Sequence, residues 1–273
     1  MLNTPLRLLI LGAHPDDAEY HAGGLATIYR QRGHTVKMIS VTDGRSGHHR
    51  YQPAELARVR RRESQAAAAV IGATYEVWEY PDGALQPTLE VREQIIRAIR
   101  SFQPDLVLTH RPNDYHPDHR AVGQAVQDAS YMITVPLVAP DVPALTRDPV
   151  VAYMPDLFTR PYAFVPDVAI DIADQMDTIV DMLACHQSQV FEFLPFNQRV
   201  AEQVPQEEAA RRQWLRTWYG NIIRPRADRF RDALVRQYGE LHGRQVAWAE
   251  AFEISEYAAP LDDATRERLF WFL

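Results

Sequence analysis

Two short segments of the sequence combine imidazole and carboxylate side chains at a density that suggests catalysis. They are residues 13–17, AHPDD, and residues 113–119, NDYHPDH. Catalytic zinc commonly takes three protein ligands from His, Asp or Glu and keeps a fourth position for water. His14, Asp17 and His119 satisfy that count. The residue types therefore indicate a divalent-metal centre for hydrolysis.

The remaining polar residues of the two segments suggest roles in proton transfer. Asp16 would stand beside the metal as a carboxylate that can take a proton from a bound water. His116 and Asp118 would form a second couple, in which the carboxylate orients the imidazole. In isolation each segment is more often a loop or cap feature, and Asp16 or Asp17 could instead cap the following helix.

The elements that must position these residues follow an alternating pattern in the first half of the chain. Apolar runs alternate with helical periodicity, which is typical of βαβ units around a parallel sheet. The predicted strands are 6–11, 36–41, 75–79, 105–109 and 168–172, and the predicted helices are 19–32, 53–71, 89–102, 118–131 and 174–190. Both polar segments directly follow a predicted strand, and ligands of open parallel sheets bind beyond the carboxyl ends of the strands. We therefore expect the two segments to meet.

The second half of the chain has a different texture. Prolines interrupt residues 134–167, which predicts a loop region with short strands and a candidate wall or lid for the site. Residues 200–273 are expected to form a helical C-terminal extension, with helical spacing at 207–219, 227–238 and 245–254. The whole chain, 1–273, is interpreted as a single domain: a Rossmann-like α/β fold with a mostly parallel sheet and flanking helices.

Composition excludes several classes of protein. The net charge of -7 argues against a nucleic-acid partner. One cysteine, Cys185, can form neither an internal disulfide nor a Cys-rich metal cluster. The sequence has no run of about 20 apolar residues and no recognisable signal peptide, so we expect a cytoplasmic protein without a membrane partner. Aromatic residues after Trp214 could support a homo-oligomer.

The two polar segments together carry a family resemblance. AHPDD near the N-terminus, combined with HPDH after the fourth predicted strand, resembles the LmbE-like, or PIG-L, family of metal-dependent N-deacetylases. The similarity spans about residues 6–130, with a weaker echo at 186–189. It implies a Rossmann-like sheet, zinc at the three ligands named above and Asp16 as general base. It also implies that His116, backed by Asp118, donates a proton or stabilises the oxyanion.

The resemblance gives the expected function. The chain should remove an acetyl group from a small N-acetylated amino sugar or sugar conjugate, using Zn²⁺, although Fe²⁺ and other divalent metals are possible. Protonated His116 would stabilise the oxyanion together with the metal. Family members often carry Glu where this chain has Arg45, which concerns the substrate rather than the chemistry. The candidate substrate contacts are Arg45, Arg111, Asn113, Asp114, Tyr115 and His186.

Three alternatives stay open from the residues alone. Two histidines and one carboxylate also form the facial triad of non-haem iron oxygenases. A Rossmann-like module could bind a nucleotide without catalysis, although the first loop lacks the Gly-x-Gly-x-x-Gly phosphate cradle. The C-terminal helices could also form a non-catalytic scaffold.

Overall fold

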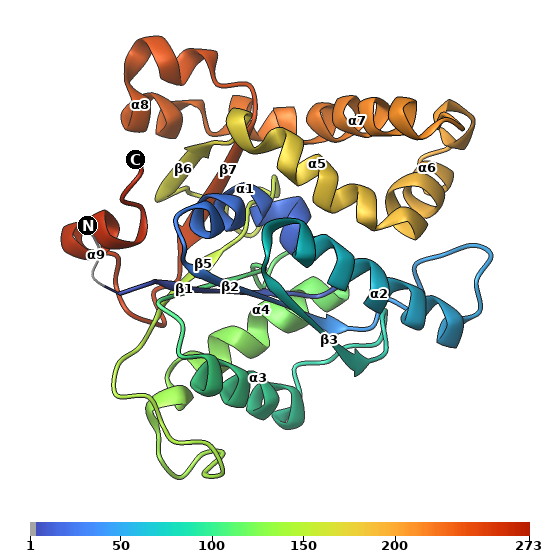
Figure 1. The fold of residues 1–273 in the computed structure, drawn as a ribbon. Coiled ribbons are helices and arrows are strands. Elements are labelled where there is room, and N and C mark those ends of the chain that lie inside the picture. Colours follow the sequence, from blue (N-terminus) through green and yellow to red (C-terminus); the bar gives the residue numbers. More distant parts are fainter. Residues whose placement is uncertain (1–3) are drawn as a thin grey trace.

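The computed structural model describes residues 4–273. Within this part of the chain, seven strands form one sheet in the order β3-β2-β1-β4-β5-β7-β6 (Figure 1). The strands are β1 (Arg7–Gly12), β2 (Thr35–Thr42), β3 (Thr74–Tyr80), β4 (Leu106–Thr109), β5 (Val150–Tyr153), β6 (Val168–Asp171) and β7 (Ala249–Ile254). The five strands from β3 to β5 run parallel, whereas β7 is antiparallel to both of its neighbours. The predicted, mostly parallel α/β fold is confirmed.

Helices cover both faces of this sheet (Figure 1). One face carries α1 (Asp17–Gln31), α2 (Pro53–Ile71) and α5 (Met176–Cys185), and the other carries α3 (Leu89–Phe102) and α4 (Pro117–Ser130). Leu8 and Ile10 of β1 point into the first core, and Leu9 and Leu11 point into the second. Strands that are buried on both faces read as continuous apolar runs, which explains why β1 was recognisable in the sequence.

The C-terminal part completes the sheet as well as adding helices. It contains α6 (Leu194–Asn197), α7 (Glu208–Arg229), α8 (Arg231–Gln245), β7 and α9 (Asp263–Leu269). Short helical segments elsewhere and within it are η1 (Met132–Thr134), η2 (Ala173–Gln175), the π-helical η3 (Ser188–Phe193) and η4 (Ala201–Gln203). The helix predicted over 245–254 is wrong, because most of that segment is β7. A short apolar run is ambiguous between strand and helix, and pairing with β5 and β6 decides it here. The helix predicted over 174–190 ends at Cys185.

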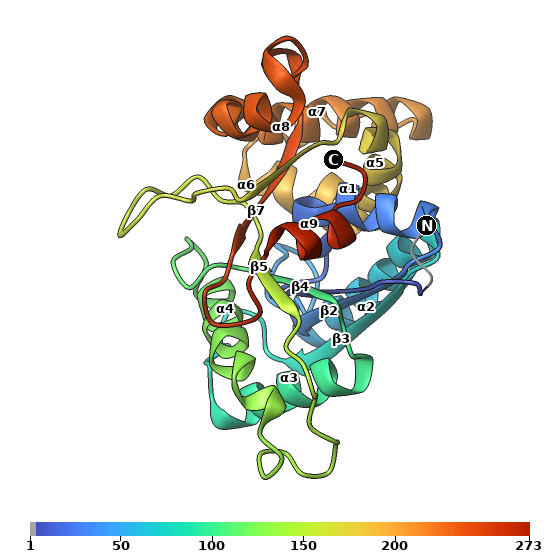
Figure 2. The same cartoon turned by 90° about the vertical axis from the view of Figure 1, so that its left-hand side faces the viewer.

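The proline-rich region is ordered by individual side chains. It contains β5, and Figure 2 shows the connection from β5 to β6 extending away from the body of the molecule. At its start, the chain turns around Arg100, which is only 2% exposed. The guanidinium of Arg100 donates to backbone carbonyls of Met132, Ile133, Val135, Val138, Ala139 and Val142. Prolines prevent regular pairing of this backbone, so one buried arginine satisfies it instead.

Helix α1 is kinked at Ala22, where φ is -143° and ψ is 17°. The kink frees backbone groups on both sides, and the C-terminal part satisfies them. On one side, the Tyr219 hydroxyl donates to the Tyr20 carbonyl at 3.0 Å. On the other side, the Glu250 carboxylate accepts the amides of Gly24 at 2.6 Å and Leu25 at 2.9 Å. A carboxylate is a favourable partner for a helix N-terminus, so the first turn of α1 is held as a separate unit.

The burial of Glu250 predicts a pH-dependent stability. Burial raises the pKa of Glu250 from 4.5 to about 7. The stabilisation of the folded state that results from this raised pKa is complete below pH 4.5 and is lost as the pH rises through about 7. The free energy of unfolding of the wild type, relative to Glu250→Gln, should therefore fall by roughly 3 kcal/mol over that window. Urea unfolding of both metal-free proteins from acidic to slightly alkaline pH measures this, and parallel pH profiles would contradict it.

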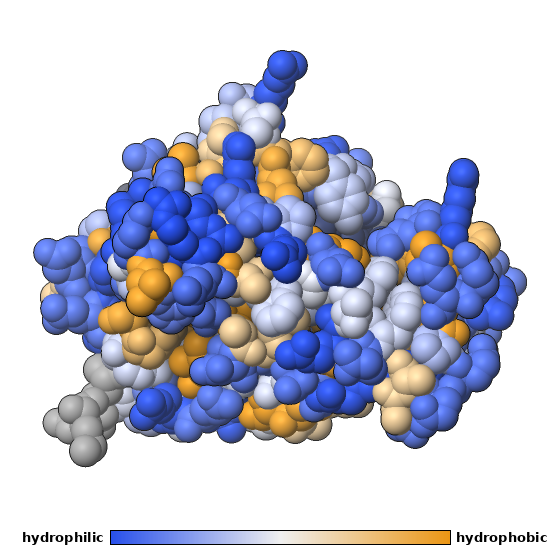
Figure 3. Space-filling model, turned by 90° about the horizontal axis from the view of Figure 1, so that it is seen from above, coloured by the Kyte–Doolittle hydropathy of each residue, from blue (hydrophilic) through white to orange (hydrophobic). Residues whose placement is uncertain are grey.

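No helix among residues 4–273 is long and apolar enough to cross a membrane. The face carrying α7 and α8 mixes hydrophobic and hydrophilic areas without one dominant patch (Figure 3). Several aromatic residues that could have served an oligomer lie within the chain's own core: Tyr219, Phe230 and Phe252 are each at most 3% exposed. A homo-oligomer stays a prediction.

Candidate metal centre

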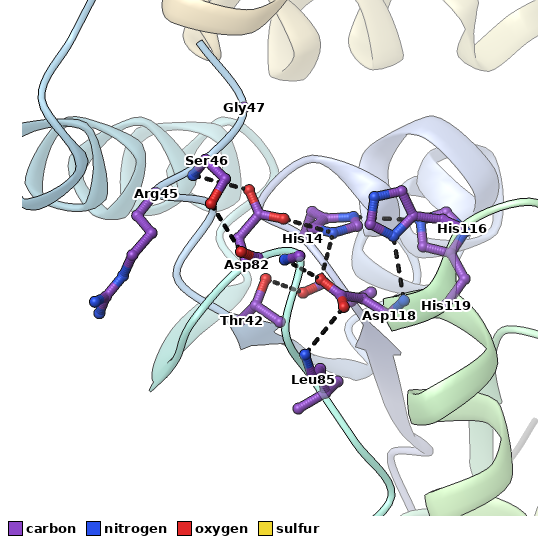
Figure 4. Close-up of polar contacts among 12 residues, drawn as sticks. His14, Thr42, Arg45, Ser46, Gly47, Asp82, Leu85, His116, Asp118 and His119 are labelled. Carbon is purple, nitrogen blue, oxygen red and sulfur yellow. Dashed lines mark hydrogen bonds and ion pairs between the residues drawn. The ribbon is translucent and has the colours of Figure 1, made fainter.

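The carboxyl ends of the neighbouring strands β1 and β4 bring the two polar segments together (Figure 4). His14 Nδ1 lies 3.3 Å from His119 Nε2. Asp17 Oδ2 is 3.5 Å from His14 Nδ1, and Asp17 Oδ1 is 3.5 Å from His119 Nε2. Zinc bonds of about 2.0–2.1 Å at tetrahedral angles place ligand atoms about 3.3 Å apart. The donor atoms of the three predicted ligands therefore lie at pairwise distances compatible with one divalent ion, and their role as its ligands stays a prediction.

Backbone contacts fix the carboxylate of Asp17. Its Oδ2 accepts the amides of Ala13 at 2.9 Å and His14 at 2.7 Å. A Cβ at position 12 would lie 2.8 Å from the Cβ of Asp17, so Gly12 is needed for this approach. His110 Nε2 is 3.1 Å from the same oxygen. Although burial opposes it, the histidines around Asp17, led by His119, hold its pKa well below the usual range, which suits a metal ligand.

Carboxylates stand behind both imidazoles. His14 Nε2 lies 3.2 Å from Asp82 Oδ1 and 3.2 Å from Asp118 Oδ2. His119 Nδ1 lies 3.1 Å from Asp114 Oδ1. Carboxylates in this position orient metal-bound histidines and raise their basicity. Among the described residues, other overlapping sets of side chains also place their donor atoms close enough to hold a metal ion. These sets are His14/His116/His119, His14/Asp82/His116/Asp118 and Asp17/His110/His119.

Asp16 has a different environment from Asp17. Its backbone has a positive φ of 118°, a conformation that costs energy for a residue with a side chain. Arg60 of α2 holds it there: the guanidinium donates to the Pro15 carbonyl and lies 3.0 Å from Asp16 Oδ2. Burial raises the pKa of Asp16 to about 6, against the lowering effect of Arg60. The Asp16 side chain accepts no hydrogen bond from a backbone amide at the start of α1, so the alternative in which Asp16 caps this helix is not supported.

His116 is the residue that begins α4. Its Nδ1 accepts the amide of Asp118 at 3.2 Å, so the neutral ring carries its proton on Nε2. Burial, with His14 and His119 nearby, lowers the pKa of His116. The resting protein therefore favours the neutral ring, and protonation of His116 during the reaction stays a prediction. The expected coupling of the Asp118 carboxylate to His116 is wrong, because that carboxylate contacts His14 and the amides of Gly83 and Leu85.

Three of the predicted substrate contacts are engaged by protein instead. Arg111 is 1% exposed and binds both oxygens of Asp156 at 2.6 Å. Arg45 pairs with Asp43 and points away from the imidazoles in Figure 4. His186 is fully buried, with Nε2 3.1 Å from the Glu19 carboxylate. Tertiary pairing, which the sequence does not reveal, removes Arg111 and His186 from the predicted contacts, whereas Arg45 pairs locally with Asp43.

The other three predicted contacts lie on the loop before α4. Asp114 stands behind His119, as described above, and its carboxylate also accepts the His116 amide at 3.0 Å. Neither side-chain amide atom of Asn113 has a hydrogen-bond partner among the described residues. Tyr115 is 68% exposed, and its ring centroid is 5.4 Å from that of His119. Tyr115 is therefore placed where a substrate could reach it, whereas the amide atoms of Asn113 are buried.

Sequence reasoning missed three residues of the centre. His110 directly follows β4, a position that the strand-end rule could have identified. Asp82 lies within the span of the family resemblance, but neither of the two polar segments includes it. Arg60 is one of four arginines in α2 at positions 58 and 60–62, and only its 3% exposure distinguishes it from its neighbours. Gly44, with φ of 67°, leaves the space that the Arg60 guanidinium fills.

Comparisons with known proteins find relatives in both sequence and fold. Residues 9–130 match the family model described as PIG-L: GlcNAc-PI de-N-acetylase. The 4-oxalmesaconate hydratase of Pseudomonas putida is 24% identical over 197 residues, covering 69% of this chain and 76% of that protein. The diacetylchitobiose deacetylase of Thermococcus kodakarensis is 27% identical over 204 residues, covering 68% and 71%. The fold is that of the N,N'-diacetylchitobiose deacetylase from Pyrococcus horikoshii, with a TM-score of 0.70, 21% identity and coverage of 92% and 84%.

Proposed function

We propose that this chain, whose residues 9–130 match the PIG-L family model, is a zinc-dependent hydrolase that removes the acetyl group from an N-acetylated amino sugar or sugar conjugate. The observation that carries this proposal is the division of labour between adjacent carboxylates. Asp17 joins two histidines in a three-ligand site, while Asp16 is kept out of it by Arg60. Two neighbouring carboxylates whose pKa values are pushed apart are typical of acid–base chemistry.

The residues suit amide hydrolysis. A zinc ion held at the site would supply Lewis acidity and lower the pKa of a water molecule. Asp16, with a pKa of about 6, is mostly ionised at pH 7 and can accept the proton of that water. His116 presents its Nε2–H as a neutral donor to the developing oxyanion or the leaving nitrogen. Asp82, Asp114 and Asp118 keep the ligand imidazoles in place.

The second candidate is the addition of water to the double bond of an unsaturated carboxylate, because one relative is a hydratase. A carboxylate substrate needs cations that can bind it. Three arginines near the centre are already paired with carboxylates, namely Arg60 with Asp16, Arg111 with Asp156 and Arg45 with Asp43, and the guanidinium of Arg226 donates to a backbone carbonyl. The other charged side chains around the metal centre are mainly carboxylates, which favours a neutral substrate rich in hydroxyl groups. The electrostatics of the site therefore support the deacetylase.

The proposal is tested by measuring acetate and free amine released from a panel of N-acetylated sugars and conjugates by zinc-loaded protein. We expect release from at least one substrate of the N-acetylglucosamine type, in equal amounts of acetate and amine. The same protein is offered unsaturated carboxylates, whose hydration is followed by the loss of ultraviolet absorbance. Hydration without any acetate release would refute the proposal in favour of the second candidate.

Removal of the imidazole at position 116 should impair turnover and spare metal binding. Losing one well-placed oxyanion donor typically lowers kcat by about 100- to 1000-fold, so we expect this loss in His116→Ala. Metal content should not change, because His14, Asp17 and His119 suffice for the ion. Steady-state kinetics and elemental analysis measure both quantities. A variant that keeps near-normal kcat would show that His116 has another role.

A further inference from the structure

The C-terminal part of the chain reaches the metal centre through Arg226 of α7. Arg226 is 6% exposed, and its guanidinium donates to the Tyr20 carbonyl at 3.3 Å. Its Nη2 lies 3.0 Å from His21 Nδ1. The Tyr20 carbonyl is one of the groups freed by the kink of α1, so Arg226 acts at the same place as Tyr219 and Glu250. Residues outside the 9–130 match therefore determine how the first turn of α1 meets the centre.

His21 faces the metal centre. It lies four residues after Asp17 in α1, and residues at this spacing share one face of a helix. Its ring meets those of His110 and His119 edge-on, with centroids 5.8 Å and 6.5 Å away. His110 and His119 are each 2% exposed, whereas His21 is only partly buried. A molecule bound at the centre could therefore reach His21.

Arg226 fixes the protonation pattern of the His21 ring. A guanidinium has only N–H donors and no acceptor, so His21 Nδ1 must offer its lone pair. The proton of the neutral ring is then on Nε2. Within residues 4–273, His21 Nε2 makes no hydrogen bond, so this N–H remains available. A ring with a fixed donor at the rim of a metal centre is suited to binding an oxygen atom.

We propose that His21 is a substrate-binding residue, whose Nε2–H donates a hydrogen bond to a hydroxyl or carbonyl oxygen of the substrate, and that Arg226 is the positioning residue that fixes the required tautomer. This inference rests on the proposed function and adds to it a contact outside the metal ligands. It also gives the C-terminal part of the chain a role in substrate recognition that acts through His21.

The first test compares two substitutions of His21. In His21→Leu the donor is absent, whereas in His21→Gln an amide N–H can reach about the same place. On the N-acetylated substrate that the wild type turns over best, we expect KM to rise about 5- to 10-fold in His21→Leu, the effect of one neutral hydrogen bond. The kcat value should change little, metal content should stay the same, and His21→Gln should restore most of the KM.

The second test places Arg226 in a double-mutant cycle with His21. Arg226→Met should raise KM alone, but it should add little to His21→Leu, because both changes remove the same contact. Arg224→Met, an exposed position on the same helix, is the control and should leave KM unchanged. Thermal unfolding of each variant separates this effect from a loss of folded protein.

The outcomes separate this inference from the function on which it rests. If the wild type releases no acetate from any substrate, the proposed function fails and the inference fails with it. If the wild type is active and His21→Leu keeps its KM, only the inference fails. Additive effects of Arg226→Met and His21→Leu would overturn the positioning role of Arg226.

Discussion

Asp16→Asn is expected to lower kcat by about 100- to 10,000-fold, the range typical of a positioned general base. Asparagine has nearly the same shape as aspartate but cannot accept the proton from water. The Arg60 guanidinium contacts Asp16 Oδ2 and also the Pro15 carbonyl, so part of its anchoring survives the change. Steady-state acetate release by wild-type and variant protein at pH 7 measures the effect.

Metal content decides how the result for Asp16→Asn is interpreted. The ion should remain at the wild-type level, because Asp16 is not one of the three ligands that fit a tetrahedral centre. Asp174→Asn, an exposed position in η2, provides a matched control and should behave like the wild type. A kcat within tenfold of the wild type would exclude Asp16 as the base. Loss of the metal would instead make Asp16 a ligand.

The meeting of the two polar segments was predictable because it depends on topology rather than on detailed packing. β1 and β4 lie side by side in the sheet, so the residues that follow them meet whatever the side chains elsewhere do. His14 and His119 are therefore brought together by the same alternation of apolar runs that predicts the sheet. The identity of the fold and the position of the centre follow from that pattern.

The partners of individual charged groups were not predictable. Arg111 pairs with Asp156, and the two are 45 residues apart across the proline-rich region. His186 is buried against Glu19, which is 167 residues away in the sequence. A sequence shows that an arginine or histidine is near the site, but only tertiary packing shows whether its charge is already neutralised. The Asp118 carboxylate supports His14 rather than its neighbour His116 for the same reason.

His14→Ala should abolish stoichiometric metal binding and acetate release, whereas His110→Ala should retain the metal with an affinity reduced by about 10- to 100-fold. The structure offers both histidines near Asp17, so the choice of ligand needs this comparison. His14 Nδ1 is within 3.5 Å of both other ligands. His110 Nε2 lies 3.1 Å from Asp17 Oδ2, the same oxygen that faces His14 Nδ1, so the two variants decide which histidine joins Asp17 at the ion.

The experiment removes all metal with a chelator, titrates Zn²⁺ back against a coloured competitor and follows acetate release at each step. Wild-type activity should return with one equivalent of Zn²⁺, because a single three-ligand site is sufficient for the reaction. His14→Ala should recover neither metal nor activity at that point. The opposite pattern, with His14→Ala binding zinc and His110→Ala failing to do so, would move the ion to the site formed by Asp17, His110 and His119. Asp16 would then need a different role, because its function depends on standing next to a centre that includes His14.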